Sequence, residues 1–338
     1  MQRLYKALLL SGFLGLASSP TLAQTAFGIQ TEFDITYGSG TIAPEGVPLE
    51  RDLLMDVYTP SPENVDYTRT TSAEPGPFPA VIYVHGGAHH RGGRRQEPFR
   101  LEAAVHSRPE DYARLLTPMG YVVFVIEYRL ATENPEPAVK PGEAGLLPDV
   151  DAYITPEVFE ATKRARGAMG LLQLEDTPED RLFLWKAGMA GAEDARKALD
   201  FVIANADRFN IDPERIAMGG HSAGGGITLN VGVGMQAPLA AIFPLSGPDI
   251  LYDHAPLIAS GDFPPTLLMY SQFDEHTQLG DLPDIISLLR AGRADYTLAW
   301  VPGFAHFYPH QAVSLGDDGT RAAVGDRIIR FLEQNLRN

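Results

Sequence analysis

The sequence predicts an α/β fold in which a mostly parallel sheet is covered by helices on both faces. Short apolar runs alternate with segments of helical periodicity through most of the chain. The apolar runs are continuous, which is typical of strands buried on both faces of a parallel sheet. Right-handed crossover connections then place helices on each side of that sheet.

The elements follow from these patterns in chain order. Residues 33–37 and 53–58 are expected to form antiparallel strands near the start of the sheet. Apolar runs predict further strands at residues 80–84, 121–126, 215–218, 240–245, 266–270 and 296–301. Helical periodicity marks residues 194–206, 282–291 and 327–336.

The interval at residues 131–190 interrupts this alternation. About 60 residues there separate a strand from the helix that should follow it, and structureless loops of that length are uncommon. Residues 156–174 have helical spacing, so the interval is expected to carry short helices of its own. We interpret it as a helical cap inserted over the carboxyl edge of the sheet. The alternative is a peripheral elaboration that takes no part in a site.

The first 23 residues have the pattern of a secretory signal peptide. Arg3 and Lys6 precede an apolar stretch at residues 7–19, and Thr21-Leu22-Ala23 supplies a cleavage site of small residues. A membrane anchor is the alternative, but the stretch is shorter than the roughly 20 residues that span a bilayer. We therefore expect an exported protein, periplasmic or extracellular, in which residues 24–338 form one domain.

Composition excludes several classes of function. The formal net charge of −16 disfavours binding to nucleic acid and to anionic membranes. The chain has no cysteine, which excludes disulfides and thiolate-bound zinc or iron–sulfur centres.

The stretch Gly220-His221-Ser222-Ala223-Gly224 contains a serine among very small residues. It matches the pattern G-x-S-x-G and lies between a predicted strand and a predicted helix, which is the context that a nucleophilic serine requires. Small neighbours permit a sharp turn that exposes the Ser222 Oγ at the edge of the sheet. The alternative is a glycine-rich turn whose serine has no catalytic role.

A nucleophilic serine needs a histidine base and an acid that orients it. His306 follows the last predicted strand, and Asp274 follows the strand before it. Because the carboxyl ends of parallel strands share one edge, both side chains can lie near Ser222. Three neighbouring acids could replace Asp274: Glu275, Asp281 and Asp284.

The other histidines receive structural or surface interpretations. His85 and His221 are expected to be structural, and five are expected at the surface or in loops: His89, His90, His106, His254 and His276. His306 and His310 have a spacing seen in metal sites, but no acidic partner motif accompanies them. We expect neither a metal nor a cofactor.

Residues 81–88 form a strand that runs into small residues, where bare backbone N–H groups can face a substrate. The residue after the nucleophile, Ala223, supplies another N–H group. Such donors stabilise the oxyanion of a tetrahedral intermediate.

Three stretches together resemble carboxylesterases of the α/β-hydrolase superfamily, over residues 32–338. They are His85-Gly86-Gly87-Ala88, Glu127-Tyr128-Arg129-Leu130-Ala131 and Gly220-His221-Ser222-Ala223-Gly224-Gly225. The similar groups are the hormone-sensitive-lipase-like and bacterial feruloyl-esterase-like enzymes. Three features depart from the lipase-like pattern: Ala88 replaces a third glycine, Glu127 replaces an aspartate, and the long insertion follows Ala131.

The resemblance implies an α/β-hydrolase fold with a Ser222, Asp274 and His306 triad. It also implies an oxyanion hole formed by the N–H groups of Gly87, Ala88 and Ala223, with Gly86 permitting the turn.

The sequence thus predicts hydrolysis of small or aromatic carboxylic esters through an acyl-enzyme. One alternative is removal of feruloyl or acetyl groups from plant polysaccharides. A serine peptidase is disfavoured because too few residues precede the first glycine-containing loop to form a β-propeller. A non-catalytic binding protein on the same fold is a further alternative.

Three arginines closely follow the loop at Gly86-Gly87-Ala88: Arg91, Arg94 and Arg95. One hypothesis places them at the acyl pocket, where they would recognise a carboxylate-bearing or phenolic ester. The alternative is an exposed loop whose arginines pair with surface carboxylates.

Overall fold

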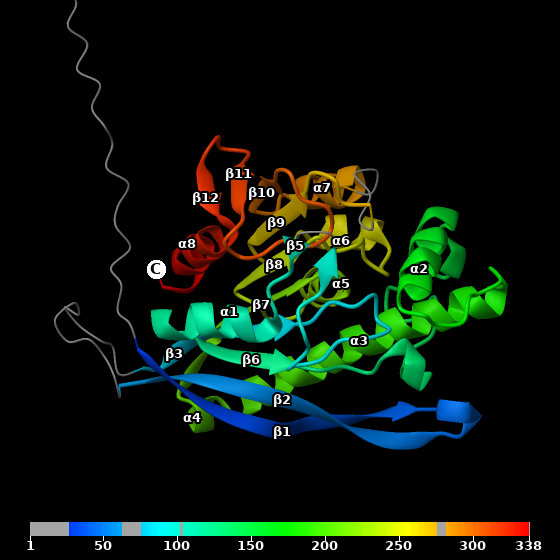
Figure 1. Ribbon diagram of the computed structural model, residues 1–338, viewed down its shortest axis with the longest axis horizontal. Coiled ribbons are helices and arrows are strands. Elements are labelled where there is room, and N and C mark those ends of the chain that lie inside the picture. Colours follow the sequence, from blue (N-terminus) through cyan, green and yellow to red (C-terminus); the bar gives the residue numbers. More distant parts are fainter. Residues whose placement is uncertain (1–26, 63–75, 102–103, 276–281, 338) are drawn as a thin grey trace, which may run out of the picture.

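A computed structural model describes residues 27–62, 76–101, 104–275 and 282–337 (Figure 1). The expected signal peptide at residues 1–23 and His276 lie outside these described residues.

A ten-stranded sheet forms the centre of the described structure, in the order β1-β2-β6-β3-β7-β8-β9-β10-β11-β12. The strands from β6 to β10 in this order are parallel, whereas β1, β2, β11 and β12 are antiparallel to their neighbours. The strands are β1 (Gly28–Ile42), β2 (Leu49–Ser61), β3 (Phe78–Val84), β6 (Val122–Ile126), β7 (Ile211–His221), β8 (Ala241–Leu245), β9 (Thr266–Ser271), β10 (Tyr296–Val301), β11 (Val313–Gly316) and β12 (Arg321–Ala323). A separate hairpin pairs β4 (Arg100–Leu101) with β5 (Ala104–Val105).

Helices cover both faces of the sheet, and α2 stands apart from them (Figure 1). Buried residues of α1 and α8 pack against one face, and those of α3, α5 and α7 pack against the other. The helices are α1 (Pro109–Leu116), α2 (Pro156–Ala168), α3 (Pro178–Ala204), α4 (Ala206–Phe209), α5 (Ala223–Leu229), α6 (His254–Ser260), α7 (Leu282–Ala291) and α8 (Val324–Leu336).

The central strand β3 shows why the apolar runs are continuous. Successive side chains of a strand point to opposite faces of the sheet. Ile82 and Val84 belong to the apolar cluster under α3, whereas Val81 and Tyr83 belong to the cluster under α1 and α8. Every residue of β3 is therefore buried, and the sheet has a hydrophobic core on each side.

The predicted fold class is confirmed: the central sheet is mostly parallel and is flanked by helices. The main difference concerns the end of the insertion. A helix expected to begin at residue 194 begins at Pro178 and continues for 27 residues, so residue 190 lies inside α3. Thr177 caps this helix, because its side chain accepts a hydrogen bond from the backbone N–H of Asp180.

A buried ion pair fixes α3 against the sheet. Arg129, which follows β6, donates from Nη2 to Asp194 Oδ1 at 2.8 Å and from Nε to Asp194 Oδ2 at 2.9 Å. Both side chains are almost completely excluded from solvent. Bidentate pairs of this kind fix orientation as well as distance. The loop after β6 and the middle of α3 are consequently held as one unit.

Candidate active site

The turn between β7 and α5 carries Ser222. Its φ of 59° and ψ of −122° are an unusual conformation for a residue other than glycine. A Cβ on Gly220 would lie 2.5 Å from the Val84 carbonyl oxygen, and one on Gly224 would collide with the same oxygen. Glycine is therefore required on both sides of the serine, because β3 passes close beneath the turn.

The structure brings three distant side chains together at the carboxyl edge of the sheet. The Ser222 Oγ and the His306 Nε2 are 2.7 Å apart. On the other side of the imidazole, Nδ1 lies 2.8 Å from the Asp274 Oδ1. This is the hydrogen-bond pattern of a nucleophile, a general base and an acid that orients the base.

Asp274 is the acid that reaches the histidine. It follows β9, its side chain is completely buried, and the Ser271 hydroxyl donates to its Oδ2 at 3.4 Å. The neighbouring acids have other positions: Glu275 and Asp284 are exposed, and Asp281 lies outside the described residues.

His221 supports His306 from behind. Its Nε2 lies 2.9 Å from the backbone carbonyl oxygen of His306, so this nitrogen must donate the hydrogen. The His221 ring lies between those of His106 and His306, with ring centroids 3.9 Å and 4.8 Å away. The sequence predicted a structural His221, and the structure identifies what it holds in place.

Gly87 and Ala88 lie in a loop opposite the nucleophile, and both line the same pocket as Ser222 and Ala223. Gly87 has a φ of 125° and Ala88 a φ of 53°. Ala88 therefore adopts a left-handed conformation that glycine would adopt without steric cost. Gly86 has a different position: it packs beneath the turn, where a Cβ would lie 3.2 Å from the Ser222 Cβ.

The three arginines of the loop after Ala88 separate into two groups. Arg91 lines the pocket, whereas Arg94 and Arg95 do not. Both of the latter bind the completely buried carboxylate of Asp56, and Arg94 also binds Asp34 and Glu127.

The hypothesis that Arg94 and Arg95 recognise substrate is therefore wrong. A buried carboxylate needs paired charges, and these two arginines supply them. They anchor the loop to β2 instead of facing the pocket.

Two histidines expected at the surface are buried. His90 and His106 expose only 3% and 4% of their surface. Burial lowers the pKa of His90 to about 4 and that of His106 to about 3, so both are neutral near pH 7. His106 lies 2.9 Å from the Tyr308 carbonyl oxygen through Nδ1, and thus helps to hold the loop that carries His306.

His310 pairs with a hydroxyl rather than with a metal-binding partner. Its Nδ1 lies 2.8 Å from the Ser107 Oγ. Among the described residues, no cluster of three or more metal-ligating side chains is present.

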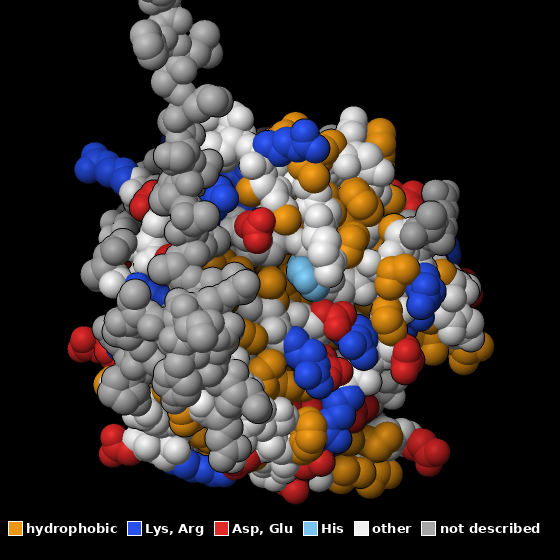
Figure 2. All heavy atoms as spheres, turned by 60° about the vertical axis from the view of Figure 1, so that its left-hand side comes forward, with side chains coloured by type: hydrophobic (Ala, Val, Ile, Leu, Met, Phe, Trp, Pro, Cys, Tyr) orange, Lys and Arg blue, Asp and Glu red, His pale blue; other side chains and the backbone are white. Residues whose placement is uncertain are grey.

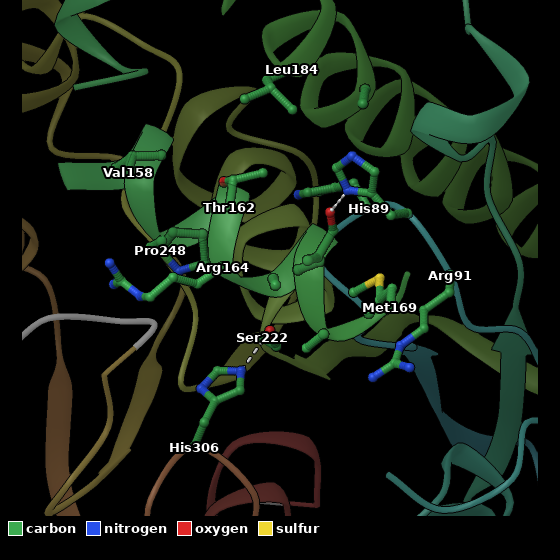
Figure 3. Close-up of a pocket in the computed structure, with 18 of the residues that line it drawn as sticks. His89, Arg91, Val158, Thr162, Arg164, Met169, Leu184, Ser222, Pro248 and His306 are labelled. Atoms are coloured by element: carbon green, nitrogen blue, oxygen red, sulfur yellow. Dashed lines mark hydrogen bonds between the residues drawn. The ribbon is translucent and has the colours of Figure 1, made fainter. Parts of the chain in front are cut away.

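A pocket of about 530 Å³ opens above Ser222 (Figure 3). One wall comes from the insertion: α2 contributes Val158, Ala161, Thr162, Arg164, Ala165 and Ala168, and Met169 follows it. Leu184, Ala187 and Gly188 of α3 continue this wall. The insertion therefore lies over the nucleophile and shapes the space in which a substrate would bind.

Two further lining residues, Arg100 and Arg164, could not be predicted from sequence patterns. Arg100 lies on a two-residue strand and Arg164 on the exposed side of α2. Helical periodicity located α2 itself, but it could not show which of its faces looks into a pocket.

The fold has relatives among solved structures. A truncated carbohydrate esterase from gut microbiota matches 95% of this chain and 100% of its own, with a TM-score of 0.51 and 14% identity. MGS-M1, an α/β hydrolase enzyme from a Medee basin deep-sea metagenome library, matches 93% of this chain and 100% of its own, with a TM-score of 0.50 and 14% identity. Likeness at this identity concerns the fold.

The chain is an α/β hydrolase by fold, as the resemblance in its sequence implied. The model of the BD-FAE family matches residues 182–239, which include most of α3, the nucleophile turn and α5. A search of curated proteins finds no match. In the described part of the chain, no helix is both long enough and apolar enough to cross a bilayer.

Proposed function

We propose that the protein is a serine esterase that hydrolyses small or aromatic carboxylic esters through an acyl-enzyme. The observation that carries this proposal is the continuous chain of contacts from Asp274 through His306 to Ser222, at 2.8 Å and 2.7 Å. Ser222 and His306 line a pocket large enough for a small organic ligand, and Asp274 lies buried behind His306.

The first half-reaction follows from this geometry. The His306 Nε2 accepts the Ser222 proton as Oγ attacks the ester carbonyl carbon. The buried Asp274 carboxylate accepts the Nδ1–H hydrogen bond and stabilises the imidazolium that forms. The imidazolium then donates its proton to the leaving alkoxide, and the acyl group remains on Ser222.

The second half-reaction uses the same groups. A water molecule loses a proton to His306 and attacks the acyl carbon, which releases the carboxylic acid and restores Ser222. In both halves, the N–H groups of Gly87, Ala88 and Ala223 would bind the oxyanion. Loss of one such donor typically lowers the rate by about 10²–10³.

A fluorophosphonate probe tests the nucleophile. We expect a covalent adduct on Ser222, no adduct in Ser222→Ala, and loss of p-nitrophenyl ester turnover in that variant by about 10⁴-fold or more. Wild-type protein that neither forms the adduct nor turns over any ester would instead favour a non-catalytic binding protein on this fold.

Feruloyl or acetyl groups on plant polysaccharides form a second candidate substrate class. The BD-FAE match and the carbohydrate esterase among the structural neighbours support testing this class. Activity on a panel of p-nitrophenyl esters and on methyl ferulate distinguishes the two substrate classes. Only a feruloyl esterase should prefer methyl ferulate to short aliphatic esters.

We also propose that the protein is exported. The support is the charged, apolar and small-residue pattern of residues 1–23. Expression of the full chain should yield a periplasmic or extracellular product whose first residue is Gln24. An unprocessed chain retained in the cytoplasm would contradict this.

A further inference from the structure

The pocket is lined by an unusual set of charges for so acidic a protein. Among the described residues that line it are three arginines, Arg91, Arg100 and Arg164, and one carboxylate, that of Glu275. The chain as a whole has a net charge of −16. The described lining of the pocket thus carries a net positive charge in an acidic protein, and we call these three arginines the basic rim.

The basic rim differs in its partners from the arginines that are paired with carboxylates. Arg51, Arg94, Arg129 and Arg181, for example, each bind at least one carboxylate. On the face drawn in Figure 2, Lys and Arg side chains lie beside Asp and Glu side chains. By contrast, no carboxylate of the described residues forms an ion pair with any arginine of the basic rim.

Arg91 is held close to the catalytic residues by aromatic rings. Its guanidinium lies 4.6 Å from the centre of the Phe99 ring. Phe99 lies 5.5 Å from Phe307, whose ring is 5.2 Å from that of His306. Partial desolvation lowers the pKa of Arg91, and no carboxylate of the described residues forms an ion pair with it.

The arginines come from different segments and surround the nucleophile. Arg91 follows the loop of Gly87 and Ala88. Arg100 lies on β4, and Arg164 lies on α2. Figure 3 shows Arg91 and Arg164 on opposite sides of Ser222. The apolar wall formed by Val158, Ala161, Ala165 and Leu184 lies in the same pocket.

We propose that the preferred substrate is an ester that carries a negatively charged group, such as a carboxylate. The basic rim binds this group while the apolar part of the ester packs on α2 and α3. This inference rests on the proposed esterase function and specifies its substrate class. Guanidinium groups suit the role because they bind carboxylates in bidentate geometry and remain charged.

Matched pairs of esters test the proposal on each side of the scissile bond. On the alcohol side, 4-acetoxybenzoate is compared with the neutral 4-acetoxybenzamide. On the acyl side, methyl 4-carboxybenzoate is compared with methyl 4-carbamoylbenzoate. The measured quantity is the ratio of kcat/KM for the anionic ester to that for its neutral partner.

We expect a ratio of about ten or more for the wild type in at least one pair, because a charged hydrogen-bonded contact typically contributes that much. The single variants Arg91→Gln, Arg100→Gln and Arg164→Gln should each lower the ratio, and the triple variant should bring it close to one. The ratio cancels any change in activity that a substitution causes equally in both esters of a pair. Arg91→Lys should keep part of the preference for the anionic ester. Lysine keeps the positive charge but lacks the planar guanidinium group that binds a carboxylate through two hydrogen bonds.

Arg321→Gln is the matched control. Arg321 is exposed on β12, does not line the pocket, and should leave the ratio unchanged. Ratios at or below one in both pairs would overturn the proposal, since that is what repulsion by the acidic protein alone would produce. A ratio that survives in all three single variants, or that falls equally in the control, would overturn it as well. Turnover of the neutral esters reports the esterase function separately.

Discussion

His221 donates a hydrogen bond from Nε2 to the backbone carbonyl oxygen of His306, over 2.9 Å. The residue next to Ser222 in the chain thus holds the main chain of His306, the proposed catalytic base. Both ends of the Ser222–His306 contact are fixed by the same short segment, so a disturbance at His221 should reach the chemistry directly.

Replacing His221 separates this hydrogen bond from ring packing. His221→Phe keeps a ring between His106 and His306 but removes the donor, and we expect kcat to fall about tenfold with KM little changed. His221→Gln retains a donor and should recover part of kcat. Steady-state kinetics and thermal unfolding together check this, and equal kcat in the two variants would contradict a positioning role.

The loop that contains Gly87 and Ala88 allows two substitutions at adjacent residues, one of which adds a methyl group and the other of which removes one. Gly87→Ala should lower kcat by about 10²–10³, because the new Cβ would collide with the Arg91 carbonyl oxygen and displace the N–H donors. Ala88→Gly should keep activity close to that of the wild type, since the left-handed backbone at Ala88 suits glycine and the N–H group remains. A large loss of kcat in Ala88→Gly would contradict this assignment of the loop.

The carboxylate of Asp56 should be important for stability. Asp56→Asn removes the charge that neutralises Arg94 and Arg95, and breaking a buried pair in this way typically costs about 3–5 kcal/mol. Asp34 and Glu127 remain near Arg94, so the lower end of this range is expected. Urea denaturation measures the change in unfolding free energy. Glu110→Gln, which breaks an exposed pair with Arg114, is the control and should cost less than about 1 kcal/mol.

Buried neutral histidines should make the fold sensitive to acid. Burial lowers the pKa of His85 to about 4 and that of His106 to about 3, whereas an unfolded histidine has a pKa near 6.5. Between these values the unfolded chain binds more protons than the folded one, so the unfolding free energy falls as pH decreases. Each group can contribute up to about 1.4 kcal/mol per pH unit below pH 6.5.

Urea denaturation at pH 7.0, 6.0 and 5.0 measures this slope. His106→Gln should reduce it, whereas His254→Gln should not, because a hydrogen bond to Asp249 raises the pKa of His254. An unchanged slope in His106→Gln would show that this ring is not the acid-sensitive group.

Continuous apolar runs predicted the parallel strands well, because strands such as β3 are buried on both faces and leave no room for polar residues. The positions after strand ends led to Asp274 and His306, since parallel strands share one carboxyl edge. Several short features were not anticipated: α1, α4, α6, the hairpin of β4 and β5, and the hairpin of β11 and β12. The stretch Asp317-Asp318-Gly319 is a turn signal that could have indicated the second of these hairpins.

The direction in which each loop side chain points could not be predicted from the sequence. Arg91 and Arg94 lie three positions apart in one loop, yet one lines the pocket and the other binds the buried Asp56. That choice depends on a carboxylate 38 residues earlier in the chain, on β2. The burial of His106 has a similar origin, because it depends on rings from two distant loops.

The continuity of α3 limits how the pocket can diversify. One end of the helix borders the ligand space through Leu184 and Ala187, while its middle is tied to Arg129 and packed on the sheet. A tilt of this helix that widened the pocket would break its contact with Arg129 and its packing on the sheet, and the whole fold needs both. Changes of selectivity should therefore accumulate on the part of α2 that faces the pocket outside the core, at residues such as Thr162 and Arg164.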